Sequence, residues 1–222
     1  MKTIKIFSLK IFVLIIIIAV AQSYAFSILM ANGAGGGYGE GSGGEGLVCG
    51  GSLIENYIEI GAGHYLEAYS SILSFFNRVE LADENTRDFY QWQSILSKAI
   101  TRVNQAAAAY DLLIQAAEAA PYNETVLLKL KNFDYDRFRV ESGLKIEIFQ
   151  EVETYLRAGD ITGVFKRIRA NLKEIHSRLK TIYEEVAQNK MPALVSLWDL
   201  NELCSSTLLF GQYVSRVFYS IL

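Results

Sequence analysis

An unbroken heptad pattern between Phe89 and Ala117 limits the folds that this chain can adopt. Apolar or small residues recur there at alternating steps of three and four: Phe89, Trp92, Leu96, Ala99, Val103, Ala106, Tyr110, Leu113 and Ala117. This spacing keeps an apolar seam on one face of a helix, which a partner helix must cover. The pattern predicts a long helix that begins near Asp83, ends before Pro121 and packs against other helices.

A second helical pattern lies just upstream. Ser52 and Glu55 have the spacing of a capping box, in which each side chain bonds the other residue's backbone N–H, and predict that a helix begins at Ser52. Apolar residues then recur on one face as far as Val79. The Gly-Ala-Gly stretch at 61–63 lowers helix propensity. We interpret it as a place of close packing against a neighbouring helix, in preference to a functional break.

Three further patterns complete the chain. The segment 122–156 is predicted as one helix with a bend at the charged stretch 134–139, and the segment 161–186 repeats the heptad steps. After Pro192, apolar residues crowd most of the helix circumference, which is typical of a central, buried helix. No convincing strand occurs, and the short connections favour antiparallel neighbours. The prediction is an all-α fold, an up-and-down bundle of four to five long helices over residues 52–222.

The first 25 residues have the pattern of a secretory signal peptide. Three lysines precede an apolar run from Ile11 to Ala21, and the small residues Ser23 and Ala25 precede a cleavage site. The run is shorter than the roughly 20 residues that a spanning helix needs. We therefore predict export, to the periplasm or out of the cell, with cleavage after Ala25. The alternative is an uncleaved anchor that continues to Met30.

Charge argues against a nucleic-acid partner. Three of the 21 Lys and Arg residues lie in the predicted signal peptide, which leaves 18 against 24 Asp and Glu residues, a net charge of −6. The segment 161–186 is locally basic, through Lys166, Arg167, Arg169, Lys173, Arg178 and Lys180. We interpret these residues as the solvent face of a helix balanced by acids on its neighbours. The alternative is a patch for anionic lipid or an acidic partner.

A glycine-rich stretch separates the signal peptide from the first helix. Eleven of the 17 glycines fall between positions 32 and 52. The stretch lacks the Gly-Lys-Ser/Thr ending and the preceding strand of a phosphate-binding loop. Cys49 lies too far beyond the apolar run for a lipid-attachment site. We predict that residues 26–51 are a flexible linker, with a segment that becomes ordered on a partner as the alternative.

The sequence indicates no metal site and no cofactor. His64 and His176 are the two histidines, and neither has a Glu three residues earlier, as a ferritin-like di-iron bundle requires. The two cysteines and two histidines also lack the close spacing of a structural zinc site. His64 could bind a ligand together with Glu59 or Glu67. A hydrogen-bonded histidine on a helix face is the simpler interpretation.

No catalytic residue can be assigned, and we predict that the protein is not an enzyme. There is no Gly-x-Ser-x-Gly nucleophile elbow. Cys204 lies in an apolar helix, where a thiol is usually inert. Carboxylate pairs such as Glu151 with Glu153 fall on a charged face beside lysines and arginines. That setting indicates solvated side chains.

Cys49 and Cys204 are the two cysteines of the chain and form a candidate disulfide. An even pair in an exported protein is typical of such a bond. The bond would close a loop of about 155 residues and would attach the end of the linker to the last helix. The alternative is that Cys204 is a small buried side chain, with Cys49 free or paired elsewhere.

These observations favour a non-catalytic exported bundle that acts as a scaffold, an adaptor or a subunit of an envelope or secreted assembly. Such a protein should have a protein partner or associate with itself. A second hypothesis is a bundle that holds a small ligand between its helices, in a candidate pocket of His64, Tyr65, Tyr69, Trp92 and Tyr110. A third is a membrane-active bundle that inserts the segment Leu203 to Leu222 into a bilayer.

Overall fold

The structure is a computed structural model that describes residues 49–119, 124–142 and 146–221. All of these belong to one compact unit, which spans residues 46–222. The predicted signal peptide (1–25) lies outside the described residues. So does the predicted linker (26–51), except for its last three residues.

The described residues form seven helices and no strand, which confirms the prediction of an all-helical protein. The helices are α2 (Cys49–Leu81), α3 (Phe89–Ala119), α4 (Glu124–Lys131), α5 (Tyr135–Ser142), α6 (Ile146–Arg157), α7 (Ile161–Ala187) and α8 (Leu194–Ile221).

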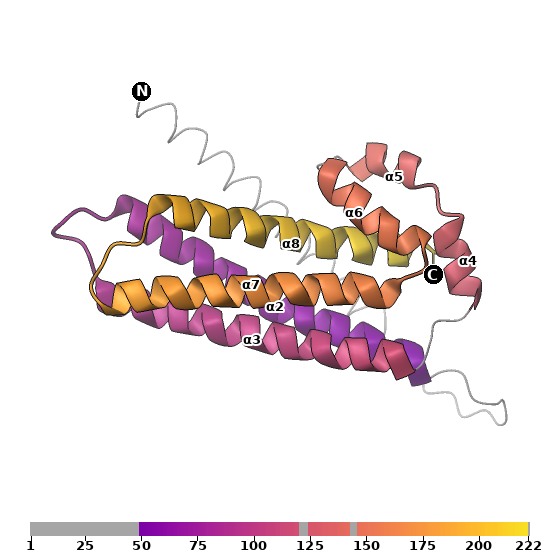
Figure 1. Ribbon diagram of the computed structural model, residues 1–222, viewed down its shortest axis with the longest axis horizontal. Coiled ribbons are helices and arrows are strands. Elements are labelled where there is room, and N and C mark those ends of the chain that lie inside the picture. Colours follow the sequence, from indigo (N-terminus) through magenta and orange to yellow (C-terminus); the bar gives the residue numbers. More distant parts are fainter. Residues whose placement is uncertain (1–48, 120–123, 143–145, 222) are drawn as a thin grey trace, which may run out of the picture. The chain divides into compact units, whose positions relative to one another are not determined.

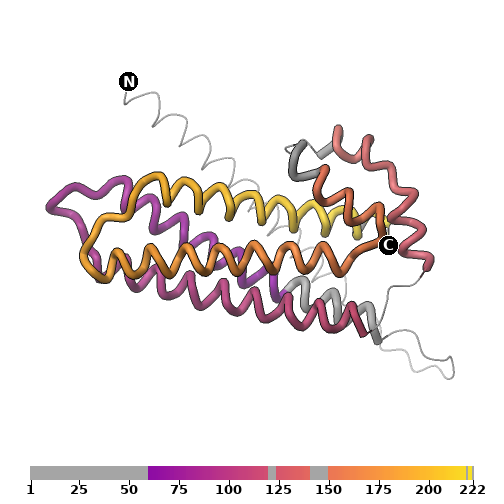
Figure 2. Tube along the Cα trace, in the orientation of Figure 1, coloured from indigo at the N-terminus to yellow at the C-terminus, as the bar shows by residue number. Residues whose placement is uncertain are grey.

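Four long helices lie alongside one another, and three short ones lie near one end of them (Figure 1). The helix α3 packs most extensively on α2 and then on α7, and α8 contacts α7, α6 and α2. The chain reverses at residues 82–88 and again at 188–193, and both connections lie at the same end of the long helices (Figure 2). We call this end the loop end. The short helices α4–α6 lie near the opposite end.

The heptad seams make the core. In α3, each predicted seam position after Phe89 is buried, and in α7 all eight predicted positions from Ile161 to Val186 are buried.

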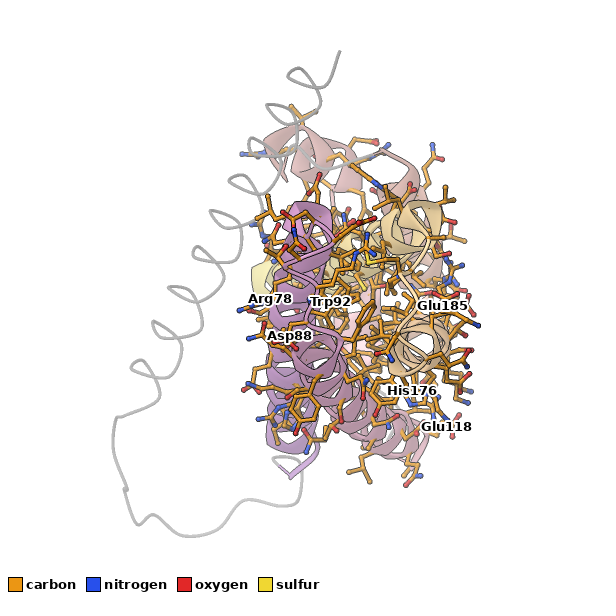
Figure 3. All side chains as sticks on the ribbon, turned by 90° about the vertical axis from the view of Figure 1, so that its left-hand side faces the viewer. Arg78, Asp88, Trp92, Glu118, His176 and Glu185 are labelled. Atoms are coloured by element: carbon orange, nitrogen blue, oxygen red, sulfur yellow. The ribbon has the colours of Figure 1, made fainter. Side chains whose placement is uncertain are left out.

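The turn before α7 also follows the sequence pattern. Gly159 has a φ of +71°, and the Asp160 carboxylate accepts a hydrogen bond of 2.7 Å from the Gly163 N–H. Viewed from the loop end, Trp92 lies between the helices, whereas Glu118 lies at the outer margin (Figure 3).

Gly61 shows why α2 tolerates a glycine within its length. A Cβ atom at this position would lie 3.0 Å from Cε2 of Tyr110 and 3.5 Å from the Ala109 Cβ, both on α3. The backbones of α2 and α3 therefore approach closely here, as the sequence predicted. Gly63 has nothing within 4 Å of the corresponding position, so close packing explains the first glycine and not the second.

Two helix boundaries differ from the prediction. The helix α2 begins at Cys49, so Ser52 lies within it and does not occupy the N-cap position. The expected single helix over 122–156 is broken into α4, α5 and α6. Asp134 caps the start of α5, because its carboxylate accepts from the Arg137 N–H at 3.0 Å. The Tyr135 hydroxyl, in turn, donates to the Leu130 carbonyl at 2.9 Å. These bonds stabilise a tight turn where the sequence predicted only a bend.

The prediction that the last helix is buried around most of its circumference is wrong for its first turns. Leu197, Leu200 and Cys204 face the core, but Leu194, Val195 and Trp198 are 58%, 70% and 57% exposed. The helix α8 runs without a break across 199–202, because it forms one element from Leu194 to Ile221. Hydrophobic composition alone therefore misjudged which face of α8 is covered.

Candidate functional site

The predicted interior pocket is occupied by its own aromatic side chains. Tyr65, Tyr69, Trp92 and Tyr110 are all buried. The Tyr65 hydroxyl donates to the Cys204 carbonyl at 2.6 Å, and the Tyr69 hydroxyl donates to Asn201 Oδ1 at 3.3 Å. These two bonds connect α2 to α8.

The other two aromatic residues of that pocket pack ring against ring. Trp92 makes an edge contact with Phe75 at 6.1 Å between ring centroids, and Tyr110 lies 6.5 Å from Phe165. Burial raises the pKa of Tyr110 to about 12. Side chains packed in this way belong to the core, which is the ordinary alternative to the ligand pocket of the second hypothesis.

His64 is only partly buried, unlike these aromatic residues, and its polar contact is with α3. Its Nδ1 atom is 3.4 Å from Nη1 of Arg102 on α3. Glu67, one of its predicted partners, instead pairs with Arg102 at 2.6 Å. Arg102 also donates to Gln105 at 2.9 Å. The structure thus has the hydrogen-bonded histidine that the simpler interpretation predicted, and it places Arg102 at the centre of a polar cluster.

The predicted Cys49–Cys204 disulfide is not formed, because Cys204 is a free, buried thiol. Its carbonyl accepts from Tyr65, which lies sixteen residues after Cys49, the first residue of α2. That separation is about 24 Å along a helix, whereas bonded cysteines have Cα atoms within about 7 Å of each other. Burial raises the pKa of the Cys204 thiol to about 12, so the side chain behaves as a small hydrophobe.

Glu153 is buried rather than solvated, contrary to the prediction for the Glu151 and Glu153 pair. Its carboxylate lies 3.1 Å from Arg139 Nε and 3.6 Å from Arg157 Nη2, and it accepts a 3.0 Å hydrogen bond from Tyr213. These four residues join α5, α6 and α8. The arrangement balances the buried carboxylate and anchors the short helices, and we assign it a structural role.

The basic residues of α7 are mostly neutralised. Lys166 pairs with Glu118, Arg169 pairs with Asp111 through two bonds of 2.7 Å, and Arg178 pairs with Glu174. Arg167 pairs with Glu151. Three of these four acids belong to α3 or α6, so the interpretation of a solvent face balanced by neighbouring acids is supported over a lipid-binding patch.

An exposed apolar cluster lies at the start of α8. Met191, Leu194, Val195 and Trp198 are 37%, 58%, 70% and 57% exposed. Leu194, Val195 and Trp198 are spaced one and three residues apart, so they lie on adjoining positions of the first helical turns. We call these four residues the α8 cluster. A contiguous exposed group of this kind is a common mark of an interaction surface, whereas single exposed apolar residues are not.

A second surface feature is an open cleft of about 680 Å³ on the outer face of α3. Polar and apolar atoms line it in about equal measure, and its aromatic residues come from two helices. Its lining consists of Tyr90, Gln93, Ser94, Ser97, Lys98, Thr101, Arg102 and Gln105 on α3, with Tyr183 on α7. We call this feature the α3 cleft. The cleft was not predicted from the sequence, because Tyr183 reaches it from a helix far along the chain. The repeated hydroxyl and amide residues on α3, outside its seam, were a usable signal.

Two further properties of the described residues bear on metal binding and on membranes. Among residues 49–119, 124–142 and 146–221, no group of three or more His, Cys, Asp or Glu side chains is placed to hold a metal ion. In the same residues, no helix combines the length and the apolar character that crossing a bilayer requires.

Comparison with known proteins yields no relative. No protein-family model, curated protein or solved structure matches the chain.

Proposed function

We propose that this protein is an exported, non-catalytic helical bundle that acts as a scaffold or adaptor and binds a partner protein through the α8 cluster. In this proposal, residues 1–25 direct export, residues 26–48 form a spacer, and α2, α3, α7 and α8 form an up-and-down bundle that presents its loop end. The single observation that carries the proposal is the exposure of Leu194, Val195 and Trp198 on adjoining turns.

The location of the cluster favours a docking role over a packing role. The face of α8 that includes Leu197, Leu200 and Cys204 already fills the core. The cluster therefore adds apolar surface that the fold does not use. At about 25 cal/mol per Å² of apolar area, covering such a surface with a partner is favourable, and a central tryptophan is a common anchor in protein interfaces.

Charge indicates the chemistry of the partner. The ranges 78–90 and 188–202 include the two loop-end connections and the α8 cluster. Within them, acidic residues outnumber basic ones. The acids are Glu80, Asp83, Glu84, Asp88, Asp199 and Glu202, and the bases are Arg78, Arg87 and Lys190. Two copies of this acidic end would repel each other, and so would an anionic bilayer. The complementary partner is a protein segment that carries apolar residues flanked by lysine or arginine.

Site-specific photocrosslinking in the native host tests the proposal. A photoreactive amino acid is placed at Trp198 or Val195, and in matched controls at the exposed positions Ser177 and Glu174 of α7. We expect one crosslinked band from the first pair and none from the controls. We also expect the variant Trp198→Asp to abolish crosslinking from position 195.

The purified pair then gives a direct measurement. Trp92 is buried, so in the variant Trp92→Phe the fluorescence reports on Trp198. Its emission should shift to shorter wavelength when a synthetic peptide from the crosslinked partner is added, and the shift should weaken with added salt. Equal crosslinking from all four positions, or a crosslinked segment without basic residues, would refute the proposal.

A further inference from the structure

The α3 cleft carries a cation without a protein partner. Lys98 lines the cleft and forms no ion pair within the described part of the chain. Arg102, also in the lining, is held by Glu67 at 2.6 Å, by Gln105 at 2.9 Å and beside His64 at 3.4 Å. The cleft thus combines one available ammonium group with one guanidinium whose position is fixed from both α2 and α3.

The remaining lining residues match a hydroxylated ligand. Ser94 and Ser97 present hydroxyl groups, Gln93 presents an amide, and the Thr101 hydroxyl donates to the Ser97 carbonyl at 3.0 Å, which leaves its oxygen to accept. Tyr90 and Tyr183 add two aromatic rings. None of the nine lining residues is acidic, and none is aliphatic.

These properties argue against two other ligand classes. An aliphatic peptide segment is a poor fit, because the lining has no aliphatic residue and its two ring side chains are those of Tyr90 and Tyr183. A simple inorganic anion would leave most of 680 Å³ unfilled, and this volume lies in the range of about 300–1,000 Å³ that is usual for organic ligands.

We propose that the α3 cleft binds an acidic oligosaccharide. The ammonium of Lys98 binds its carboxylate or sulfate group, with Arg102 beside it, through charge-assisted hydrogen bonds, which are roughly twice as strong as neutral ones. The hydroxyl and amide groups bond the sugar hydroxyls, and the rings of Tyr90 and Tyr183 contact its apolar faces. From Tyr90 to Gln105 the lining extends about 22 Å along α3, which suits several sugar units in a row.

Binding is measured by titration calorimetry and by saturation-transfer NMR on the mature chain. The acidic probe is a hyaluronan tetrasaccharide, and the neutral probe of equal length is chitotetraose. We expect the acidic probe to bind at least tenfold more tightly. Lys98→Gln should weaken its binding by about tenfold or more, and Ser97→Glu, which places an acid in the cleft, should do the same.

Two controls separate this site from general electrostatics and from the α8 cluster. Lys173 is an exposed lysine of α7 outside the cleft, so Lys173→Gln should leave binding within about twofold of the parent, as should Trp198→Asp. The proposal is overturned by equal binding of the two sugars, by equal loss in Lys173→Gln and Lys98→Gln, or by absence of binding. Adenosine monophosphate or sodium sulfate binding as tightly as the tetrasaccharide would likewise overturn it.

Discussion

Two glycines in α2 provide a matched test of how closely this helix approaches α3. Gly61→Ala and Gly63→Ala add the same methyl group two residues apart, and each should gain about 0.5–1 kcal/mol from helix propensity. A Cβ at position 63 meets nothing within 4 Å. We therefore expect Gly63→Ala to raise the free energy of unfolding by that amount.

Gly61→Ala should behave differently because its methyl group meets a buried ring. The new Cβ would lie 3.0 Å from Cε2 and 3.3 Å from Cδ2 of Tyr110 on α3. The Tyr110 ring also lies beside Phe165 of α7. Overpacking of this kind typically costs about 1–3 kcal/mol. After the gain in propensity, the net effect on the free energy of unfolding should lie between no change and a loss of about 2 kcal/mol.

The assay is urea denaturation followed by far-ultraviolet circular dichroism, with the slope against urea checked for constancy. The quantity that decides is the difference in unfolding free energy between the two variants, which should be about 1–3 kcal/mol. Combining Gly61→Ala with Tyr110→Leu should shrink this difference, because the ring atoms that obstruct the methyl group are removed. An equal gain from both single alanines would show that α2 and α3 are not in close contact at this level, and the packing reasoning would be wrong.

Three further predictions concern buried polar groups. In a Cys49→Ser variant, Cys204 should resist alkylation at pH 8 until urea unfolds the protein, because its thiol is buried and burial raises its pKa to about 12. Labelling is followed by mass spectrometry, and rapid labelling of the native protein would contradict the prediction. Burial raises the pKa of Tyr110 to about 12, so the stability that its neutral phenol contributes is present below pH 10 and is lost as the pH rises from 10 through 12. The thermal unfolding midpoint should therefore fall between pH 10 and pH 12, and it should fall less in Tyr110→Phe. Glu153→Gln removes a buried charge that faces two arginines and should cost about 3–5 kcal/mol in urea denaturation, whereas Glu174→Gln, at an exposed pair, should cost less than about 1 kcal/mol.

The heptad pattern predicted the helices whose packing depends on one seam. In α3 and α7, alternating steps of three and four specify a single apolar face, and the structure buries that face. Over 122–156 the sequence predicted one helix with a bend, but the Asp134 carboxylate caps a new helix there and the segment is divided. Periodicity averages over many residues, so it does not detect a break made by one side chain.

Burial within a predicted helix was harder to assign when partners were distant in sequence. Glu153 was expected on a solvated face because its near neighbours are charged. Its partner Tyr213 lies 60 residues away, and Arg139 belongs to a different helix. Trp198 shows the opposite error, since a helix with apolar residues on several faces does not reveal which face its neighbours cover. In both cases the deciding information is tertiary.

The two proposed surfaces can be tested separately because neither uses the positions that hold the fold together. The α3 seam includes Leu96, Ala99 and Val103, whereas the cleft uses Ser97, Lys98 and Thr101 between them. Residues one or two positions from a seam point away from it at about 100° per residue, so Lys98→Gln leaves the core unchanged. On α8, Trp198 adjoins the buried Leu197 in the same way. If Trp198→Asp abolished sugar binding as well as crosslinking, the two sites would have to be coupled through the core, and unfolding curves of that variant would show whether the helices themselves had changed.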